Sequence, residues 1–512
     1  MEFDFSKSND PWIINGTVIL FNYIDEKSDE LKECINNNKI KCDYDNLKIC
    51  CPDVNNLKNF LECIVNMVQE NNYITKKNKG LVIENDELKA FDRLNKSPLT
   101  NYFFKGINPI AGKDININSV NDKIKLQYEE FKKMQKNIKI KDSKSKLNLF
   151  SINNFKNGQR CDFCNQKILS DSIKASYYPF TASLEKYKNF NSNFKRKGKI
   201  CILCAVSSFM VYYRLPFLIS DGFLFFAFPV INAKSESRKI WKILETQTGV
   251  SIFSEYSNFA EHGDNDPFRS FILLIEYIYS KIEKNIKPEI NDNEKDIANQ
   301  WKKLSWVIGY STTKIIRNLY TYNETEKLFR LVNILKSKNI ILSDLINKFK
   351  ININGNYNHF YEKEISRKIL FFEDLNRDIE LFYGDYIKSK KEYIKRLNDF
   401  LFIYNKEVLN MDEKLIKTCY YIGKTIGEYC RGDETKPEDK DTLYALRSCT
   451  NLGQFLQFLD EATFKIKNLN IPMTFLGQMD SKNWQDVKSL ISIFAHQAFF
   501  GSNKIESNRE VN

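Results

Sequence analysis

The sequence predicts an α+β protein: a mixed N-terminal body with a four-cysteine zinc knuckle, then a mainly α-helical C-terminal half that ends in a helix bundle. Three observations predict this class. Two Cys-x-x-Cys pairs lie in the first half, and β-prone apolar runs flank the turn signals Asn-Gly and Asp-Gly. Apolar residues then recur with helical spacing over most of the second half.

The chain has 512 residues, of which 42% are hydrophobic, and at roughly 100 to 200 residues per domain this indicates two to four domains. We expect an N-terminal body over residues 1–410, with a zinc-binding segment at 155–232, and a helical bundle over residues 411–512. The formal net charge is +12, and residues 411–512 hold 13 basic and 14 acidic residues, so the positive charge belongs to the body. Such a body attracts polyanions, either nucleic acid or acidic membrane surfaces.

The first element is expected to be a β-hairpin, because apolar runs at 12–14 and 17–23 flank Asn15-Gly16, a dipeptide suited to a tight turn with positive φ angles. From Leu57 to Val68, apolar residues follow the spacing of a helix with one buried stripe. The lysine-rich segment 123–146 predicts an amphipathic helix with a solvated charged face.

A second hairpin is expected in the middle of the chain, where runs at 217–220 and 223–230 flank Asp221-Gly222. Beyond Ala233 the pattern is helical nearly to the end of the sequence. The expected helices lie at 268–284, 325–350, 367–404, 415–429, 442–460 and 484–499.

The sequence predicts a soluble, cytoplasmic protein. It opens with acidic residues where a secretory signal carries basic ones, and its most apolar stretch, 215–231, is broken by two prolines and a glycine. We therefore expect no contact with a membrane. In the reducing cytoplasm the 12 cysteines should be thiols or metal ligands and not disulfides.

Four cysteines predict one structural zinc ion. Cys161 and Cys164 form one Cys-x-x-Cys knuckle, and Cys201 and Cys204 form another. Together they supply the four thiolates that close a tetrahedral zinc shell, and a closed shell leaves no open position for catalysis. Two other interpretations remain, a redox-active pair of the thioredoxin kind and ordinary buried thiols, but redox chemistry requires only one pair.

The insert between the knuckles is the best candidate for nucleic-acid contact. Its cations are interleaved with Tyr187, Phe190 and Phe194, a combination that suits phosphates and exposed bases. A basic surface loop without any ligand would have the same composition. The candidate residues are Lys186, Lys188, Lys195, Arg196, Lys197 and Lys199.

No motif for catalysis is found. The three histidines are widely separated, and none belongs to a metal-hydrolase motif. Phosphate-binding loops, dinucleotide fingerprints and serine-hydrolase elbows do not occur in the sequence. We therefore expect a binding protein and not an enzyme.

The two knuckles, the buried hairpin that follows them and the helical C-terminal half resemble the CRISPR-associated CXXC-CXXC family, the large subunit of the type I-B Cascade complex. The segment around Asn15 and Gly16 also looks like the opening strand and turn of that family, which makes this turn a second candidate for nucleic-acid contact.

The resemblance implies a subunit that binds the crRNA 5′ handle and double-stranded target DNA, recognises the protospacer-adjacent motif and guides the displaced strand. It also implies backbone and small subunits as partners, and a helicase-nuclease that does the cutting. Residues 411–512 resemble a small subunit, and one hypothesis is that Met411 serves as an internal start. The rival hypotheses are a divergent zinc-containing nuclease and a stand-alone zinc-dependent DNA-binding protein.

Overall fold

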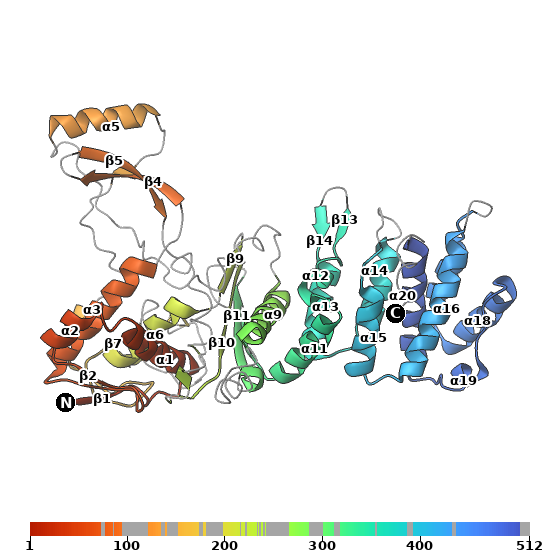
Figure 1. Cartoon of the computed structure of the whole chain (residues 1–512), viewed down its shortest axis with the longest axis horizontal. Coiled ribbons are helices and arrows are strands. Elements are labelled where there is room, and N and C mark those ends of the chain that lie inside the picture. The colour runs from red at the N-terminus through yellow and green to blue at the C-terminus, as the bar shows by residue number, and fades with distance from the viewer. Residues whose placement is uncertain are drawn as a thin grey trace. The chain divides into compact units, whose positions relative to one another are not determined.

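The computed structural model describes 19 stretches of the chain (Figure 1). They are residues 1–72, 77–84, 87–94, 121–134, 139–140, 152–173, 178–180, 198–215, 217–220, 223–232, 234, 237–238, 241, 266–285, 301–311, 318–353, 356–386, 393–432 and 437–501. Two compact units are present. Unit 1 comprises residues 1–265 and 286–323, and unit 2 comprises residues 266–285 and 324–512. The expected division between residues 410 and 411 falls inside unit 2.

Residues Pro11–Glu26 form helix α1, so the prediction of a hairpin here is wrong. Two local signals outweigh the Asn-Gly dipeptide. Pro11 stands at the first helical position, where its missing N–H is not needed, and the Asp10 carboxylate caps the helix by accepting from the N–H of Ile13 at 3.0 Å. Twelve residues of α1 are buried, including Asn15 and Gly16. The apolar runs that flank Asn15 and Gly16 therefore belong to a helix that is buried on nearly all sides, and not to two strands.

Helix α6 (Ile202–Arg214) packs closely against α1. A Cβ atom added at Gly16 would lie 1.7 Å from the backbone oxygen of Ser207, so only glycine allows this approach. Hydroxyl and indole groups join the two helices beside it. Thr17 Oγ1 donates to Ser207 Oγ at 2.9 Å, and Trp12 Nε1 donates to the Ser208 carbonyl at 3.1 Å. These bonds satisfy buried polar groups and fix the register of the pair.

The start of unit 1 is a small sheet with two helices. Strands β1 (Glu2–Asp4), β3 (Lys48–Cys50) and β2 (Lys41–Asp43) pair antiparallel in the order β1-β3-β2. In the sequence, helix α2 (Lys32–Asn37) precedes β2, and helix α3 (Val54–Asn72) follows β3. Helix α3 confirms the helix expected from Leu57. Cys34 and Cys63 form a disulfide between α2 and α3. The expectation of thiols or metal ligands is wrong for this pair, because composition does not reveal which cysteines adjoin in space.

Unit 1 also contains a four-stranded antiparallel sheet, which includes the second predicted hairpin. Its order is β12-β11-β10-β9. Strand β9 (Phe217–Ser220) pairs with β10 (Phe223–Pro229), which confirms the hairpin. Strands β11 (Trp306–Ser311) and β12 (Asn318–Tyr322) come from the region expected to be helical. That expectation is wrong here, because these short aromatic and β-branched runs complete the sheet beside β10.

Unit 1 has further strands and helices outside these two sheets. Strands β4 (Lys77–Glu84), β5 (Glu87–Leu94) and β6 (Lys139–Ile140) form one sheet, and α5 (Asp122–Met134) confirms the expected lysine-rich helix over part of its length. The 3-10 helix η2 (Ile152–Asn154) precedes the cysteine region. Strands β7 (Ser170–Ser172) and β8 (Lys199–Cys201) pair within that region.

Unit 2 is mostly helical, as expected. Its first helices are α9 (Pro267–Asn285), α11 (Thr325–Ser337), α12 (Leu342–Ile346), α13 (Phe360–Phe371), α14 (Asn376–Tyr386) and α15 (Leu397–Glu407). Strands β13 (Ile351–Ile353) and β14 (Asn356–Asn358) form a hairpin between α12 and α13. The region 367–404, expected to be one helical stretch, takes in parts of three helices. Phe372 at the end of α13 and Arg396 at the start of α15 adopt left-handed backbone conformations.

The end of unit 2 is a helical bundle. It contains α16 (Glu413–Arg431), α17 (Lys440–Ser448), α18 (Leu452–Lys465), α19 (Met473–Leu476) and α20 (Trp484–Phe500). Gly423 and Gly427 lie one turn apart on α16, and Cβ atoms there would meet backbone oxygens of α20 at 2.5 and 2.1 Å. The two backbones therefore approach closely, as small residues one turn apart permit. Within the described residues, no helix combines the length and apolarity that crossing a membrane requires.

The contact at Gly16 predicts a specific loss of stability. In Gly16→Ala the added methyl group must push α1 away from α6, because the atom it meets belongs to the backbone. We expect the free energy of unfolding to fall by about 1 to 3 kcal/mol, measured by urea denaturation. The matched control is Gly453→Ala in α18, where the nearest atom is a side-chain oxygen at 3.3 Å. This control should keep or raise stability, since alanine favours helix.

A second prediction concerns Asp266, which is 2% exposed at the start of α9. Burial raises the pKa of this carboxyl group to about 7 from 3.8. As the pH rises, this carboxyl group therefore ionises in the unfolded chain before it ionises in the folded protein. The free energy of unfolding should fall between about pH 4 and pH 7. Asp266→Asn keeps an acceptor for the N–H of Phe268 and cannot ionise. In urea denaturation the variant should match the native protein at pH 4 and exceed its stability at pH 8. Equal stability at pH 8 would contradict the raised pKa.

Candidate metal centre

Four cysteine sulfurs converge inside unit 1. The Sγ atoms of Cys161, Cys164, Cys201 and Cys204 all lie within 4.8 Å of one another. All four side chains are buried, and the most exposed, that of Cys164, is 9% exposed. Zinc–sulfur bonds of about 2.3 Å place the sulfurs of a tetrahedral site about 3.8 Å apart. The 3.6 Å between the sulfurs of Cys164 and Cys201 fits this geometry.

The first two sulfurs come from a tight turn. The N–H of Asn165 donates to the Cys161 carbonyl at 2.9 Å, and the N–H of Cys161 donates to the Gln166 carbonyl at 3.1 Å. Asn165 closes the turn in a left-handed conformation with φ of 58°, which asparagine tolerates better than most residues. The N–H of Phe163 points at the Cys161 sulfur at 3.4 Å. Such N–H donors stabilise thiolate charge.

The other two sulfurs lie where β8 ends and α6 begins. Cys201 is the N-cap of α6, and its sulfur accepts from the N–H of Cys204 at 3.5 Å. The N–H of Cys201 donates to the sulfur of Cys161 at 3.3 Å, which joins the two knuckles. The positive end of the helix dipole faces this sulfur pair and favours the thiolate form.

The electrostatics of the cluster call for a cation. Burial raises the pKa of the Cys201 thiol well above its usual range, whereas hydrogen bonds from Cys164 and Cys201 lower the pKa of Cys161. Four thiolates in so small a buried volume repel one another unless a cation stands between them. The cluster could therefore hold one metal ion, and a shell filled by four protein sulfurs has no position for a substrate.

The first knuckle is tied to the N-terminus of the chain. Gln166 Nε2 donates to the carbonyl of Asp4 in β1 at 2.6 Å. The ring of Phe163 packs against that of Tyr178 at 4.8 Å between centroids. The Tyr178 hydroxyl in turn donates to Asp10 Oδ2 at 2.5 Å, and Asp10 is the N-cap of α1. Burial raises the pKa of Asp10. The segment that carries the first knuckle is thus bonded to β1 and, through Tyr178, connected to the start of α1.

The basic insert begins and ends at fixed points of this scaffold. Phe180 is buried against Trp12, with ring centroids 5.2 Å apart. On the other side, the N–H of Ile173 donates to the Gly198 carbonyl at 2.9 Å. Of the six candidate cations only Lys199 lies in the described chain, in β8, where its N–H donates to Asp162 Oδ2 at 2.5 Å. The five others, Lys186, Lys188, Lys195, Arg196 and Lys197, lie outside the described residues.

Asn15 and Gly16 are not available to a ligand, so their assignment to nucleic-acid contact is wrong. The Asn15 side chain is 0% exposed and donates to the carbonyls of Pro11 and Pro229, at 2.8 and 2.7 Å. Its oxygen accepts from Trp241 Nε1 at 3.0 Å. Asn15 therefore links α1 to β10 in the core. The Asp-Pro signal at residues 10 and 11 could have revealed the helix from the sequence.

Comparison of the sequence with protein-family models and with curated proteins gives no match.

Loss of two ligands, one from each knuckle, tests the centre. In Cys161→Ser/Cys201→Ser we expect bound metal to fall from about one ion per chain to near zero, because neither knuckle keeps two thiolates. The segment should also lose stability, since metal binding contributes directly to folding. Elemental analysis and thermal unfolding measure the two effects. Cys42→Ser is the matched control and should keep its metal, since Cys42 lies outside the cluster. A native protein that contains no metal would contradict the assignment.

Proposed function

We propose that this protein is a zinc-stabilised, non-enzymatic nucleic-acid-binding subunit of a crRNA-guided CRISPR surveillance complex. In this proposal it is the large subunit of a type I-B Cascade. It binds the crRNA 5′ handle and the target DNA, recognises the protospacer-adjacent motif and helps to recruit the helicase-nuclease.

The observation that carries the proposal is the convergence of Cys161, Cys164, Cys201 and Cys204 into one buried cluster. A closed four-thiolate site fits a zinc ion that holds a fold together, since zinc accepts four soft ligands without further geometric demand. The cluster is formed by the same two knuckles that underlie the resemblance to the CXXC-CXXC family. The net charge of +12 adds support, because a basic protein attracts the phosphates of nucleic acid.

Two experiments separate this proposal from its rivals. Affinity purification of the native protein from its host should yield a crRNA and the repeating backbone subunits. A stand-alone DNA-binding protein would carry neither. Incubation of the purified protein with DNA or RNA and Mg²⁺ or Mn²⁺ should leave the substrate intact, whereas a divergent nuclease would cleave it. Cleavage that persists in repeated chromatographic fractions would overturn the non-enzymatic assignment.

The insert supplies a quantitative test of binding. Lys195→Ala/Arg196→Ala/Lys197→Ala should weaken binding to all sequences alike and flatten the dependence of log K on log salt by about 0.9 for each phosphate that the variant no longer neutralises. Fluorescence anisotropy at several salt concentrations measures both quantities. The control is Lys7→Ala/Lys32→Ala/Lys41→Ala, which removes three exposed lysines of the same unit. An unchanged slope in the insert variant would remove the insert from the interface.

A further inference from the structure

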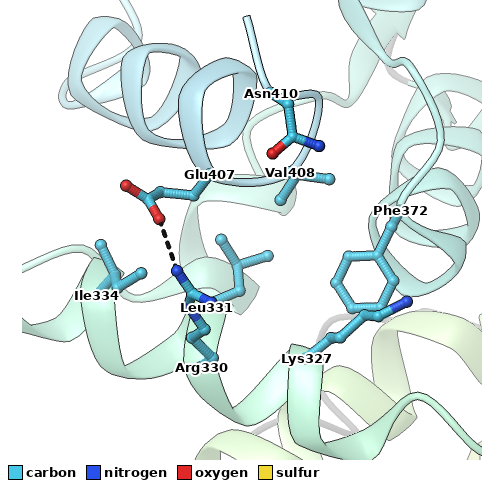
Figure 2. A pocket seen from close by; sticks show the side chains of 8 residues that line it. All are labelled: Lys327, Arg330, Leu331, Ile334, Phe372, Glu407, Val408 and Asn410. Carbon is cyan, nitrogen blue, oxygen red and sulfur yellow. Dashed lines mark hydrogen bonds and ion pairs between the residues drawn. The ribbon is translucent and has the colours of Figure 1, made fainter.

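Unit 2 contains a hollow of about 260 Å³ that the sequence did not indicate (Figure 2). One wall is a face of α11 with Lys327, Arg330, Leu331 and Ile334, which recur at the spacing of a single helix face. The opposite walls are Phe372, at the end of α13, and the turn 407–410 that follows α15. The hollow therefore combines an apolar floor with a charged rim.

Phe372 lines this hollow in an unusual backbone conformation. It is the C-cap of α13, with φ of 55° and ψ of 37°, a left-handed conformation that glycine adopts freely and a bulky side chain rarely does. Glycine would adopt this conformation at a lower energetic cost. The presence of phenylalanine therefore indicates that its ring makes a contact that glycine cannot make. The ring is half-exposed and turned toward the hollow in Figure 2.

Two cations stand on the rim. Arg330 Nη2 lies 3.1 Å from Glu407 Oε2, with the arginine side chain 74% exposed. Lys327 Nζ lies 2.7 Å from Glu324 Oε2, with the lysine side chain 67% exposed, and 5.7 Å from the centre of the Phe372 ring. The acids of these pairs are less exposed, at 27% for Glu407 and 46% for Glu324, but a pair whose cation is so exposed contributes little to stability. Both cations can therefore exchange a carboxylate for a more highly charged anion such as a phosphate, which arginine binds with two parallel hydrogen bonds.

Asn410 adds a polar group that can identify a ligand. It follows α15 with φ of 54°, and in Figure 2 its carboxamide points toward the space between Arg330 and Phe372. A carboxamide offers one donor and one acceptor side by side, which matches the edge of adenine. The hollow thus presents an aromatic ring, an amide and two cations around one small volume.

We propose that this hollow binds a single nucleotide unit, either a free nucleotide or one unstacked residue of a single strand. The base stacks on Phe372 over the apolar floor of Leu331 and Val408, its edge meets Asn410, and the phosphate lies between Lys327 and Arg330. The hollow has a volume of about 260 Å³, so the proposed ligand is one nucleotide unit and not a longer segment. The inference deepens the proposed function and rests on it, since it assigns to unit 2 a specific place for nucleic acid.

The test compares binding of AMP and of a labelled eight-nucleotide single strand to the full chain, by calorimetry and fluorescence anisotropy. Phe372→Gly removes the ring and suits the left-handed backbone, so the variant should fold at least as stably as the native protein. We expect AMP affinity to fall about tenfold or more, because stacking on one aromatic ring contributes that much. Phe372→Tyr should restore binding. Lys338→Ala, an exposed lysine just beyond α11, is the control and should leave binding unchanged.

The outcomes separate the sources and the two proposals. If the strand competes with AMP, the ligand is a nucleotide within a strand, and if AMP binds without such competition, it is a free nucleotide. Native affinity in Phe372→Gly for both probes overturns the hollow as a site while the proposed function stands. A native protein that binds neither probe overturns the hollow as well, and if it also copurifies without crRNA the proposed function fails with it.

Discussion

The part of unit 1 that surrounds the cysteines depends on one electrostatic constraint: four buried sulfurs can lie together as thiolates only around a cation. The cluster joins two chain segments about 40 residues apart in the sequence. Cys161 lies in a turn, and Cys201 lies at the end of strand β8. It also includes the N-cap of α6, Cys201, and so adjoins the first turn of that helix. A metal ion held by this cluster would take the place of an apolar core, because the turn that carries Cys161 and Cys164 has few apolar residues of its own.

Close packing and buried hydrogen bonds connect this cluster to the N-terminal helix α1. α6 begins at the cluster and contacts α1 where Gly16 permits backbone approach. The aromatic contact of Phe163 with Tyr178, and the bond from Tyr178 to Asp10, reach the start of the same helix by another route. Two separate connections therefore join the cluster to α1. The described residues on either side of the basic insert, Phe180 and Gly198, contact this same part of unit 1.

Unit 2 is organised by where its helices end. Phe372 and Asn410 both adopt left-handed conformations at the ends of helices, and both line the same hollow. Those helix ends turn the chain so that an aromatic ring, an amide and two cations of α11 face one another. The two proposed contacts with nucleic acid thus differ in kind. The insert of unit 1 offers dispersed positive charge, whereas the hollow of unit 2 offers stacking and a single phosphate position.

The sequence by itself determined the α+β class, the four cysteines of the candidate metal centre and most helices of unit 2, because Cys-x-x-Cys pairs and helical periodicity are local patterns. It misassigned α1, where Asn15-Gly16 indicated a turn, because the use of that glycine depends on Ser207 almost 200 residues away. It also could not place β11 and β12 beside β10, pair Cys34 with Cys63, or gather Lys327, Phe372 and Asn410 around one hollow. Tertiary structure alone decided these features, since each depends on which distant segments pack together, and local propensity carries no information about that.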